Sequence, residues 1–182
     1  CETQGLSIAL RVRHAEVDEA SILSNADVRS LYQLGNGEIW AGMNERGVAV
    51  LDPQLRPIGQ ILTNDSATGQ ASGAALFKGG VVGGITQSTD GSVWVGSDSG
   101  IYQFSPQRKL LRHYSAGQGR ARRMLATGDG SVWAGTQDGV YRRPAGGEGF
   151  DRLRLQGGGV LNGNVSALAE STDGSIWVGG NN

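Results

Sequence analysis

Residues 88–102 read STDGSVWVGSDSGIY, and later stretches of the chain repeat most of this pattern. Residues 127–141 read TGDGSVWAGTQDGVY, and residues 171–180 read STDGSIWVGG. A more divergent copy, NGEIWAGM, lies earlier in the chain at residues 36–43. Internal self-similarity of this kind is the sequence signature of a repeat protein, in which each copy forms one supersecondary unit.

A tryptophan marks each copy, with an Asn-Gly or Asp-Gly pair beginning four residues before it and a glycine two residues after it. The tryptophans are Trp40, Trp94, Trp133 and Trp177, and the glycines that follow them are Gly42, Gly96, Gly135 and Gly179. We interpret both sets as structural positions of the repeat. Successive tryptophans are 54, 39 and 44 residues apart, and about 40–45 residues is the size of one four-stranded propeller blade.

The residues around Trp94 predict a β-strand that is buried on both faces. Asp-Gly between two short apolar runs is a strong hairpin signal, because the turn requires positive φ angles. Val93, Trp94 and Val95 are consecutive apolar residues, so both faces of their strand must be covered. Sheets that stack face to face around an axis meet this requirement. We therefore predict an all-β fold, a β-propeller of four-stranded antiparallel blades, with the rings of Trp94 and Trp133 buried between blades.

The phase of the copies predicts the blade boundaries. It indicates one partial β-propeller over residues 1–182, about four repeats long and cut out of phase with the blades. An inserted loop is expected within residues 63–80, where small and polar residues predominate. We expect an open arc that either associates with itself through its ends or is marginally stable, whereas a closed four-bladed ring would pair residues 5–17 with residues 165–179. The expected parts are an outer half-blade at 1–17, blades at 18–60, 61–115 (with the inserted loop) and 116–158, and an inner half-blade at 159–182.

The composition excludes several other classes of protein. Sixteen Lys and Arg residues against seventeen Asp and Glu residues give a net charge of −1, so no overall positive field recruits nucleic acid. A single cysteine cannot form an internal disulfide. No stretch approaches the roughly 18 consecutive apolar residues of a membrane-spanning helix. The 31 glycines follow no collagen-like period, so they indicate many turns between short strands.

The consensus N/D-G-x-[IV]-W-[AV]-G-x(3,4)-G-[VI] resembles the two-component regulator propeller repeat. The stretch SILSNADVRSLYQLGNGEIWAGMNERGVAVLD, residues 21–52, follows this repeat almost throughout. The resemblance implies a slice of a larger, seven-bladed propeller in the periplasmic sensor region of a bacterial receptor. It also implies a membrane span and a cytoplasmic histidine kinase or diguanylate cyclase elsewhere in such a receptor. On this basis we expect a non-catalytic sensory propeller.

Two other functions are kept as alternatives. STDGSVW, residues 88–94, resembles the Asp box of sialidase-type propellers, Ser-x-Asp-x-Gly-x-Thr-Trp, but is one residue shorter between Asp and Gly. The arginine triad and the Tyr/Glu pair of those enzymes are not recognisable. A carbohydrate-active enzyme, either a glycosidase or a lyase, is one alternative to the sensor, and a scaffold that only binds proteins is the other.

Residues with chemical potential have simpler structural interpretations. Asp90, Asp129 and Asp173 each precede a glycine in a hairpin, where an aspartate forms the turn. His14 and His113 lie on the fourth strands of different repeats, so they are not expected to meet around a metal. We expect no metal, no cofactor and no catalytic residue.

Propellers bind ligands at the mouth of their central channel, so the loops that enter the first strand and leave the second strand matter most. GRARR, residues 119–123, is the densest basic segment; it is either a solvated loop or a contact for an anion, since arginine binds carboxylate or sulfate through two hydrogen bonds. The expected partners are a small molecule or oligosaccharide, together with further blades and signalling domains of the parent chain, and no nucleic acid. The candidate ligand-binding residues are Asn44, Arg46, Asp98, Gln137, Asp138, Arg120 and Arg122.

Overall fold

The computed structural model describes residues 22–23, 25–61, 77, 80–114, 120–155, 159 and 161–181. These residues form strands and turns without a helix. The strands make three four-stranded sheets and one two-stranded sheet, and every pairing is antiparallel. The predicted all-β fold of four-stranded antiparallel blades is therefore confirmed.

The sheets, named blades 1–4 here, follow one another along the chain, and the strands within each blade pair in sequence order. Blade 1 contains β1 (Val28–Gln33), β2 (Ile39–Met43), β3 (Val48–Leu51) and β4 (Pro57–Ile61); blade 2 contains β5 (Val82–Gln87), β6 (Val93–Ser97), β7 (Gly100–Phe104) and β8 (Leu110–Tyr114); blade 3 contains β9 (Arg123–Ala126), β10 (Val132–Gly135), β11 (Val140–Arg143) and β12 (Asp151–Arg152); blade 4 contains β13 (Asn164–Glu170) and β14 (Ile176–Asn181).

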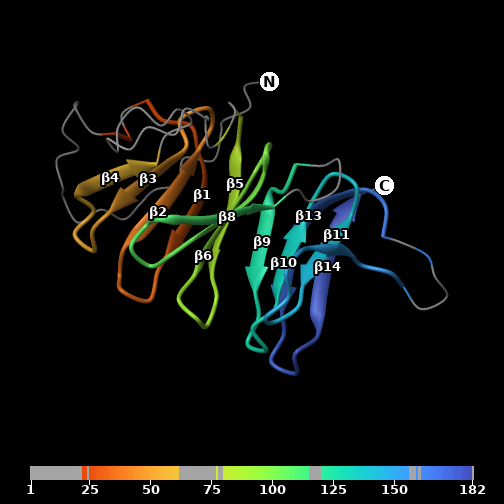
Figure 1. Cartoon of the computed structure of the whole chain (residues 1–182). Coiled ribbons are helices and arrows are strands. Elements are labelled where there is room, and N and C mark those ends of the chain that lie inside the picture. Colours follow the sequence, from red (N-terminus) through yellow and green to blue (C-terminus); the bar gives the residue numbers. More distant parts are fainter. Residues whose placement is uncertain are drawn as a thin grey trace, which may run out of the picture.

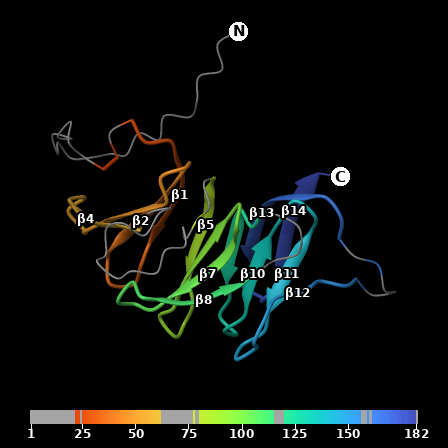
Figure 2. The same ribbon diagram turned by 45° about the horizontal axis from the view of Figure 1, so that its top comes forward.

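The blades lie side by side in chain order (Figures 1 and 2). Consecutive first strands, β1 with β5, β5 with β9 and β9 with β13, contact one another. The hairpin turns between first and second strands all lie at the lower end of the molecule in Figure 1. The opposite end, where first strands begin and second strands end, therefore gathers the loops that the sequence singled out.

Hairpin turns form at the Asp-Gly pairs, but not as two-residue loops: the Ser88 N–H donates to the Ser92 carbonyl at 3.0 Å, so residues 89–91 form the loop, and only the glycine of the pair has a positive φ. In the turn of blade 2, Oδ1 of Asp90 accepts hydrogen bonds from the backbone N–H of Ser92 at 2.9 Å and from the hydroxyl of Ser88 at 2.6 Å. Gly91 adopts a positive φ of 82°, which an L side chain rarely adopts. Nε1 of Trp94 donates to the Ser88 hydroxyl at 2.9 Å, so the same serine links the turn to the tryptophan.

The interface between blades 1 and 2 is an apolar core that includes Trp40. The Trp40 ring is completely buried and meets the ring of Phe104 edge-on at 5.9 Å between centroids. Val93 and Val95 of β6 point into this core. Trp94 points to the opposite face, where it joins a second core with residues of blade 3. The prediction that this strand is buried on both faces is confirmed.

Trp94 packs between blades 2 and 3 with two further aromatic rings. Its centroid lies 5.7 Å from that of Tyr114 and 5.9 Å from that of Phe150. The guanidinium of Arg143 lies over the same indole at 5.0 Å, a favourable cation–π distance. The predicted burial of the Trp94 ring is confirmed, with 1% of the residue exposed.

The burial of the tryptophans decreases toward blade 4. Trp133 is only partly buried; it lines a hollow of about 440 Å³ together with Arg142, Ile176 and Val178. Arg142 places its guanidinium 5.3 Å from the Trp133 ring centre. Trp177 is 69% exposed. The last tryptophan of the series thus lacks the cover that the first two have.

A β-bulge lies near the start of the first strands. The pairing register shifts between Val28 and Ser30 in blade 1, between Val82 and Gly84 in blade 2, and between Val165 and Ala167 in blade 4. Arg122 holds the corresponding place in blade 3, eleven residues before its tryptophan. Bulges redirect side chains and are frequent beside functional sites.

Several sequence expectations fall outside the described residues. These are the outer half-blade at residues 1–17, the pairing of residues 5–17 with residues 165–179, and most of the inserted loop at residues 63–80. The part of the chain that the structure describes also contains no helix of the length and apolarity that crossing a membrane requires.

Candidate functional site

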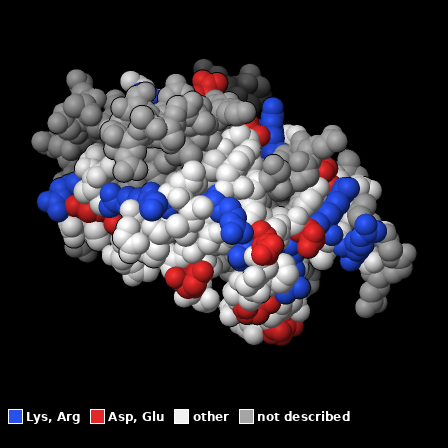
Figure 3. Space-filling view, in the orientation of Figure 1, with Lys and Arg blue, Asp and Glu red and all other residues white. Residues whose placement is uncertain are grey.

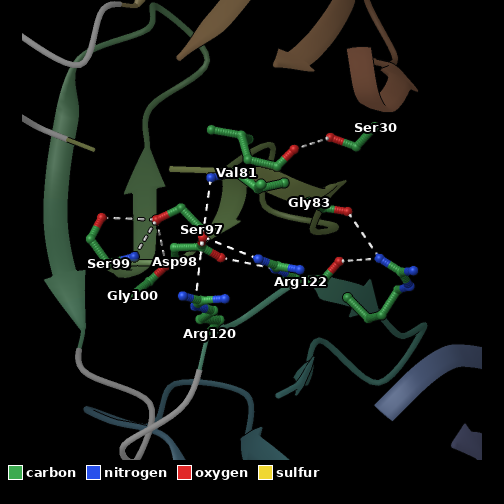
Figure 4. A network of polar contacts seen from close by, with 11 residues as sticks. Ser30, Val81, Gly83, Ser97, Asp98, Ser99, Gly100, Arg120 and Arg122 are labelled. Carbon is green, nitrogen blue, oxygen red and sulfur yellow. Dashed lines mark hydrogen bonds and ion pairs between the residues drawn. The ribbon is translucent and has the colours of Figure 1, made fainter. Parts of the chain in front are cut away.

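A network of polar contacts joins blades 2 and 3 at the end where first strands begin (Figure 4). Asp98, in the turn between β6 and β7, is its centre. Nε of Arg122 donates to Oδ1 of Asp98 at 2.8 Å, and Nη2 donates to Oδ2 at 3.1 Å. Nε of Arg120 lies 3.7 Å from Oδ2. The structure thus brings together three of the seven candidate residues.

Backbone groups of blade 2 hold Asp98 in place. Its Oδ2 accepts the backbone N–H of Val81 at 3.3 Å, and its own N–H donates to the Val81 carbonyl at 3.1 Å. Gly100 follows with a φ of 129°, and a Cβ there would lie 2.6 Å from the carbonyl oxygen of Tyr114. The turn therefore needs glycine at this position, and it fixes the direction of the Asp98 carboxylate.

Asp98 remains ionised at neutral pH. Burial raises the pKa of its carboxyl group, but the hydrogen bonds from Arg122 and Val81 and the charges of both arginines outweigh burial. The pKa of Asp98 therefore lies below its ordinary value of 3.8. In turn, the hydrogen bond to Asp98 raises the pKa of Arg122 above its ordinary value.

A second polar group surrounds Asp138, in the turn between β10 and β11, and does not join the first network. Its Oδ1 accepts the Thr136 hydroxyl at 2.5 Å, and its Oδ2 accepts the Tyr141 hydroxyl at 3.0 Å. Arg152 donates to the backbone carbonyl of Asp138. Burial raises the pKa of Asp138, but the hydrogen bonds from Thr136 and Tyr141 and the charge of Arg152 outweigh it, so the pKa is lowered. Its immediate partners lie within blade 3.

The other candidates lie apart from Asp98. Asn44 donates to Oδ2 of Asp27 at 3.4 Å and pairs with Val81 in an isolated bridge, so it borders the network without contacting the carboxylate. Arg46 is exposed in the turn after β2, where its carbonyl accepts Nε2 of Gln60 at 3.1 Å. Gln137 is exposed beside Asp138.

Arg123 is a member of the network that the sequence analysis did not select. Its Nη1 donates to the carbonyl of Arg122 at 2.8 Å and to that of Gly83 at 3.5 Å, and its Nε donates to the carbonyl of Ser166 at 2.6 Å. It therefore contacts blades 2 and 4 from its place at the start of blade 3. Comparing the position ten residues before each tryptophan would have identified it, because the other blades have Ser30, Gly84 and Ala167 there.

Of the two histidines named in the sequence analysis, His113 lies within the described residues. The ring of His113 stacks on Tyr102 at 4.3 Å between centroids, and its Nε2 lies 3.1 Å from the carbonyl oxygen of Ser99. His14 lies outside the described residues. Elsewhere in the described part of the chain, no group of three or more His, Cys, Asp or Glu side chains is arranged to hold a metal ion.

Charge is mixed over the face seen in Figure 3, where blue and red side chains alternate. The described residues also contain ion pairs, for example Arg108 with Glu38 at 2.8 Å and Arg142 with Asp129 at 3.1 Å.

The stacked sheets, their Asp-Gly turns and the tryptophans between them define a β-propeller repeat protein. Residues 159–182 match the sequence model of the family described as the two component regulator propeller. The resemblance predicted from the sequence is thereby confirmed for the last of the four copies. A comparison with curated proteins gives no match to the chain.

Solved structures with the same fold include extracellular domains of bacterial signalling proteins. The extracellular domain of the hybrid two component system BT3049 from B. thetaiotaomicron has a TM-score of 0.66 and 22% identity, over 84% of this chain and 20% of that one. The extracellular domain of the one component system BT4673 from the same organism has a TM-score of 0.62 and 16% identity, with the same coverage. This chain therefore spans about a fifth of the length of these two structures.

An enzyme has the same fold. Virginiamycin B lyase from Staphylococcus aureus has a TM-score of 0.61 and 15% identity, over 83% of this chain and 48% of that one. At such low identity these likenesses establish the propeller fold and leave the activity to be argued from residues.

Proposed function

We propose that this chain is part of a non-catalytic sensory propeller in the extracytoplasmic region of a bacterial transmembrane signalling receptor. Because the chain spans about a fifth of the extracellular domains that it is similar to, the remaining blades and the signalling domains would come from the rest of the receptor. Ligand binding to the propeller would then be passed on through the stacked blades toward the membrane.

One observation carries this proposal. Residues 159–182 match the two component regulator propeller, and the other three copies share the tryptophan, the glycine after it and the turn before it. The repeat type therefore extends over the whole series of blades. The structures of extracellular domains from a hybrid and a one component system support the same assignment at the level of the fold.

The end of the blades that holds Asp98 is the proposed ligand-binding end. It combines the loops after the second strands with the starts of the first strands, and it holds the polar network between blades 2 and 3. A small molecule or an oligosaccharide is the proposed ligand. The contact residues proposed from the sequence are Asn44, Arg46, Asp98, Gln137, Asp138, Arg120 and Arg122.

A carbohydrate-active enzyme is the alternative, and the likeness to virginiamycin B lyase is the observation that favours it. The two functions differ in what the polar network must do. A lyase or glycosidase needs an acid or base that exchanges protons with the substrate, whereas Asp98 is held ionised by a bidentate arginine. The network suits recognition better than proton transfer.

A fusion experiment tests the proposed function. The native gene is expressed in a bacterium from its own start codon through the codon for residue 182. Alkaline phosphatase, or alternatively green fluorescent protein, is fused after residue 182. We expect active phosphatase and dark fluorescent protein, because phosphatase folds only outside the cytoplasm and this fluorescent protein only inside it. The opposite result contradicts the proposal. Turnover of oligosaccharides by the purified chain would favour the enzyme instead.

A further inference from the structure

Among the four blades, only blade 3 has a cluster of three arginines at the start of its first strand. The positions thirteen, eleven and ten residues before Trp133 are Arg120, Arg122 and Arg123. The equivalent residues are Asp27, Arg29 and Ser30 in blade 1, Val81, Gly83 and Gly84 in blade 2, and Asn164, Ser166 and Ala167 in blade 4. Since three of the four blades form their first strands without this cluster, the repeat itself does not require it.

Gly83 of blade 2 lies directly against Arg122 of blade 3. A Cβ on Gly83 would lie 2.9 Å from Cβ and 3.0 Å from Cα of Arg122, which is closer than side-chain atoms normally approach. Blade 1 has Arg29 at the position of Gly83. Glycine at this position therefore lets blade 2 approach the Cα, Cβ and Cγ atoms of Arg122 closely.

The cluster carries more positive charge than its one carboxylate balances. Arg122 uses Nε and Nη2 on Asp98, and Arg123 donates only to neutral backbone carbonyls. Arg120 lies 3.7 Å from Asp98, which is longer than a hydrogen bond. Its side chain is half exposed, against 16% for Asp98. Within the described residues, Asp98 thus pairs with Arg120 and Arg122, and Arg123 has no ion pair with a carboxylate.

We propose that the start of blade 3 binds an oxyanion, a carboxylate or sulfate group of a small ligand, with Arg120 as the contact residue and Arg122 as a positioning residue held by Asp98. This inference rests on the proposed ligand-binding role of this end of the propeller. The planar guanidinium of Arg120 has donors that reach solvent, and its fork matches the spacing of two oxygens in either anion. Arg123 contributes charge close by, while its hydrogen bonds keep it in place.

A titration of the purified chain, followed by two-dimensional amide NMR, tests this site. The probes are D-galacturonate, inorganic sulfate and, as the neutral control, D-galactose. We expect saturable shifts of amides near Arg120 with at least one of the two anions, no such shifts with galactose, and weaker binding at high salt. The anion that binds more tightly identifies the source of the oxyanion. Binding of neither anion overturns the proposal, as does equal binding of galactose.

Matched variants separate a binding role from a structural one. Arg120→Gln is expected to weaken binding about tenfold to a hundredfold, as for the loss of one charge-assisted contact, and to leave the thermal midpoint unchanged. Arg29→Ala, an arginine of the same region in blade 1 that pairs with Asp27, is the control and should bind like the original chain. Undiminished binding by Arg120→Gln overturns the proposal.

Arg122→Lys tests the positioning role. Lysine keeps the charge but cannot hold Asp98 with two donors. Weaker anion binding with unchanged salt dependence is expected, and unaltered affinity contradicts the role of Arg122. All of these measurements use the purified chain, so a failure to bind anions would not contradict an extracytoplasmic location. A cytoplasmic location, in turn, would not contradict a measured anion site.

Discussion

Trp94 and Trp177 stand in nearly identical sequences, STDGSVWVG and STDGSIWVG, yet one is 1% exposed and the other 69% exposed. Both follow the same turn, with an aspartate that accepts the backbone N–H two residues on. The difference lies outside the repeat. Trp94 meets Tyr114 from the outer strand of its own blade and Phe150 from blade 3, whereas Trp177 belongs to a sheet of two described strands.

The comparison shows which features of a blade are local and which belong to its neighbours. The turn forms in every copy, because its hydrogen bonds connect residues only two to four positions apart. The tryptophan is buried only where another strand and another blade supply apolar side chains. Stability in repeat proteins is approximately a sum of such intrinsic and nearest-neighbour contributions, so substitutions at equivalent positions should have unequal effects.

The largest effect is expected from Trp94→Ala. Removing this fully buried ring leaves a cavity between blades 2 and 3, which should reduce the free energy of unfolding by about 3–5 kcal/mol. Urea unfolding followed by far-UV circular dichroism measures this loss without relying on tryptophan fluorescence. A loss below about 1 kcal/mol would mean that the Trp94 ring is not enclosed between the blades.

Trp133→Ala tests a tryptophan whose burial is intermediate between that of Trp94 and that of Trp177. Its ring is partly buried against the Arg142 guanidinium and faces the hollow toward blade 4. We expect a loss of roughly 2 kcal/mol in the free energy of unfolding, since less apolar area leaves water than at Trp94. Arg142→Ala, which removes the guanidinium that lies over the Trp133 ring, is measured beside it. A loss for Trp133→Ala equal to that for Trp94→Ala would contradict the difference in burial.

Asp129→Asn tests the turn between β9 and β10, whose hydrogen bonds Asp129 accepts. Hydrogen bonds from Thr127 and Ser131 lower the pKa of Asp129 from 3.8 to about 2. The folded state therefore favours the ionised form, and this contribution is present above pH 4 and lost as the pH falls from 4 to 2. At neutral pH the substitution should cost about 1 kcal/mol.

The pH dependence provides the check on Asp129. Urea midpoints of the original chain should fall between pH 4 and pH 2, and Asp129→Asn should reduce this fall. Asp173 has the same lowered pKa of about 2 in a far more exposed sheet, so Asp173→Asn should change the profile in the same direction. An unchanged profile in both variants would show that the turns are not held by their carboxylates.

The fold could be predicted from the sequence because its determinants are short-range. The Asp90 turn, the apolar run around Trp94 and the strand order of a blade all follow from residues within one copy. The unequal burial of Trp133 and Trp177 could not be predicted in this way, because it depends on how many strands lie against each ring.

The candidate site was predicted only in part for a similar reason. Asp98, Arg120 and Arg122, three of the residues that the sequence selected, do come together. Their pairing crosses from blade 2 to blade 3 and depends on the stacking of the blades, which no local pattern specifies. Asn44 and Asp138 were selected by the same topology, yet Asp138 binds residues of its own blade, and Asn44 contacts Asp27 and Val81 without reaching Asp98. Arg123 lies in the basic segment at residues 119–123 but was not among the candidate residues, because its contacts with Gly83 and Ser166 also cross between blades.

The smallest effect is expected from Trp177→Ala. With 69% of the residue exposed, little apolar area returns to water on unfolding, so the loss should stay within about 0.5 kcal/mol, as for other surface substitutions. The fluorescence lost in this variant should be the red-shifted, quencher-accessible part of the emission, in contrast to that lost in Trp94→Ala. If, as the proposed function requires, a further blade follows in the parent receptor, the decisive comparison uses a longer chain that includes that blade. There, a third strand beside β14 and an aromatic side chain opposite Trp177 should raise the loss toward the value found for Trp94→Ala. If the loss stays small in the longer chain, the tryptophan position of blade 4 is not an interface between blades, and the equivalence of the four copies fails at that position.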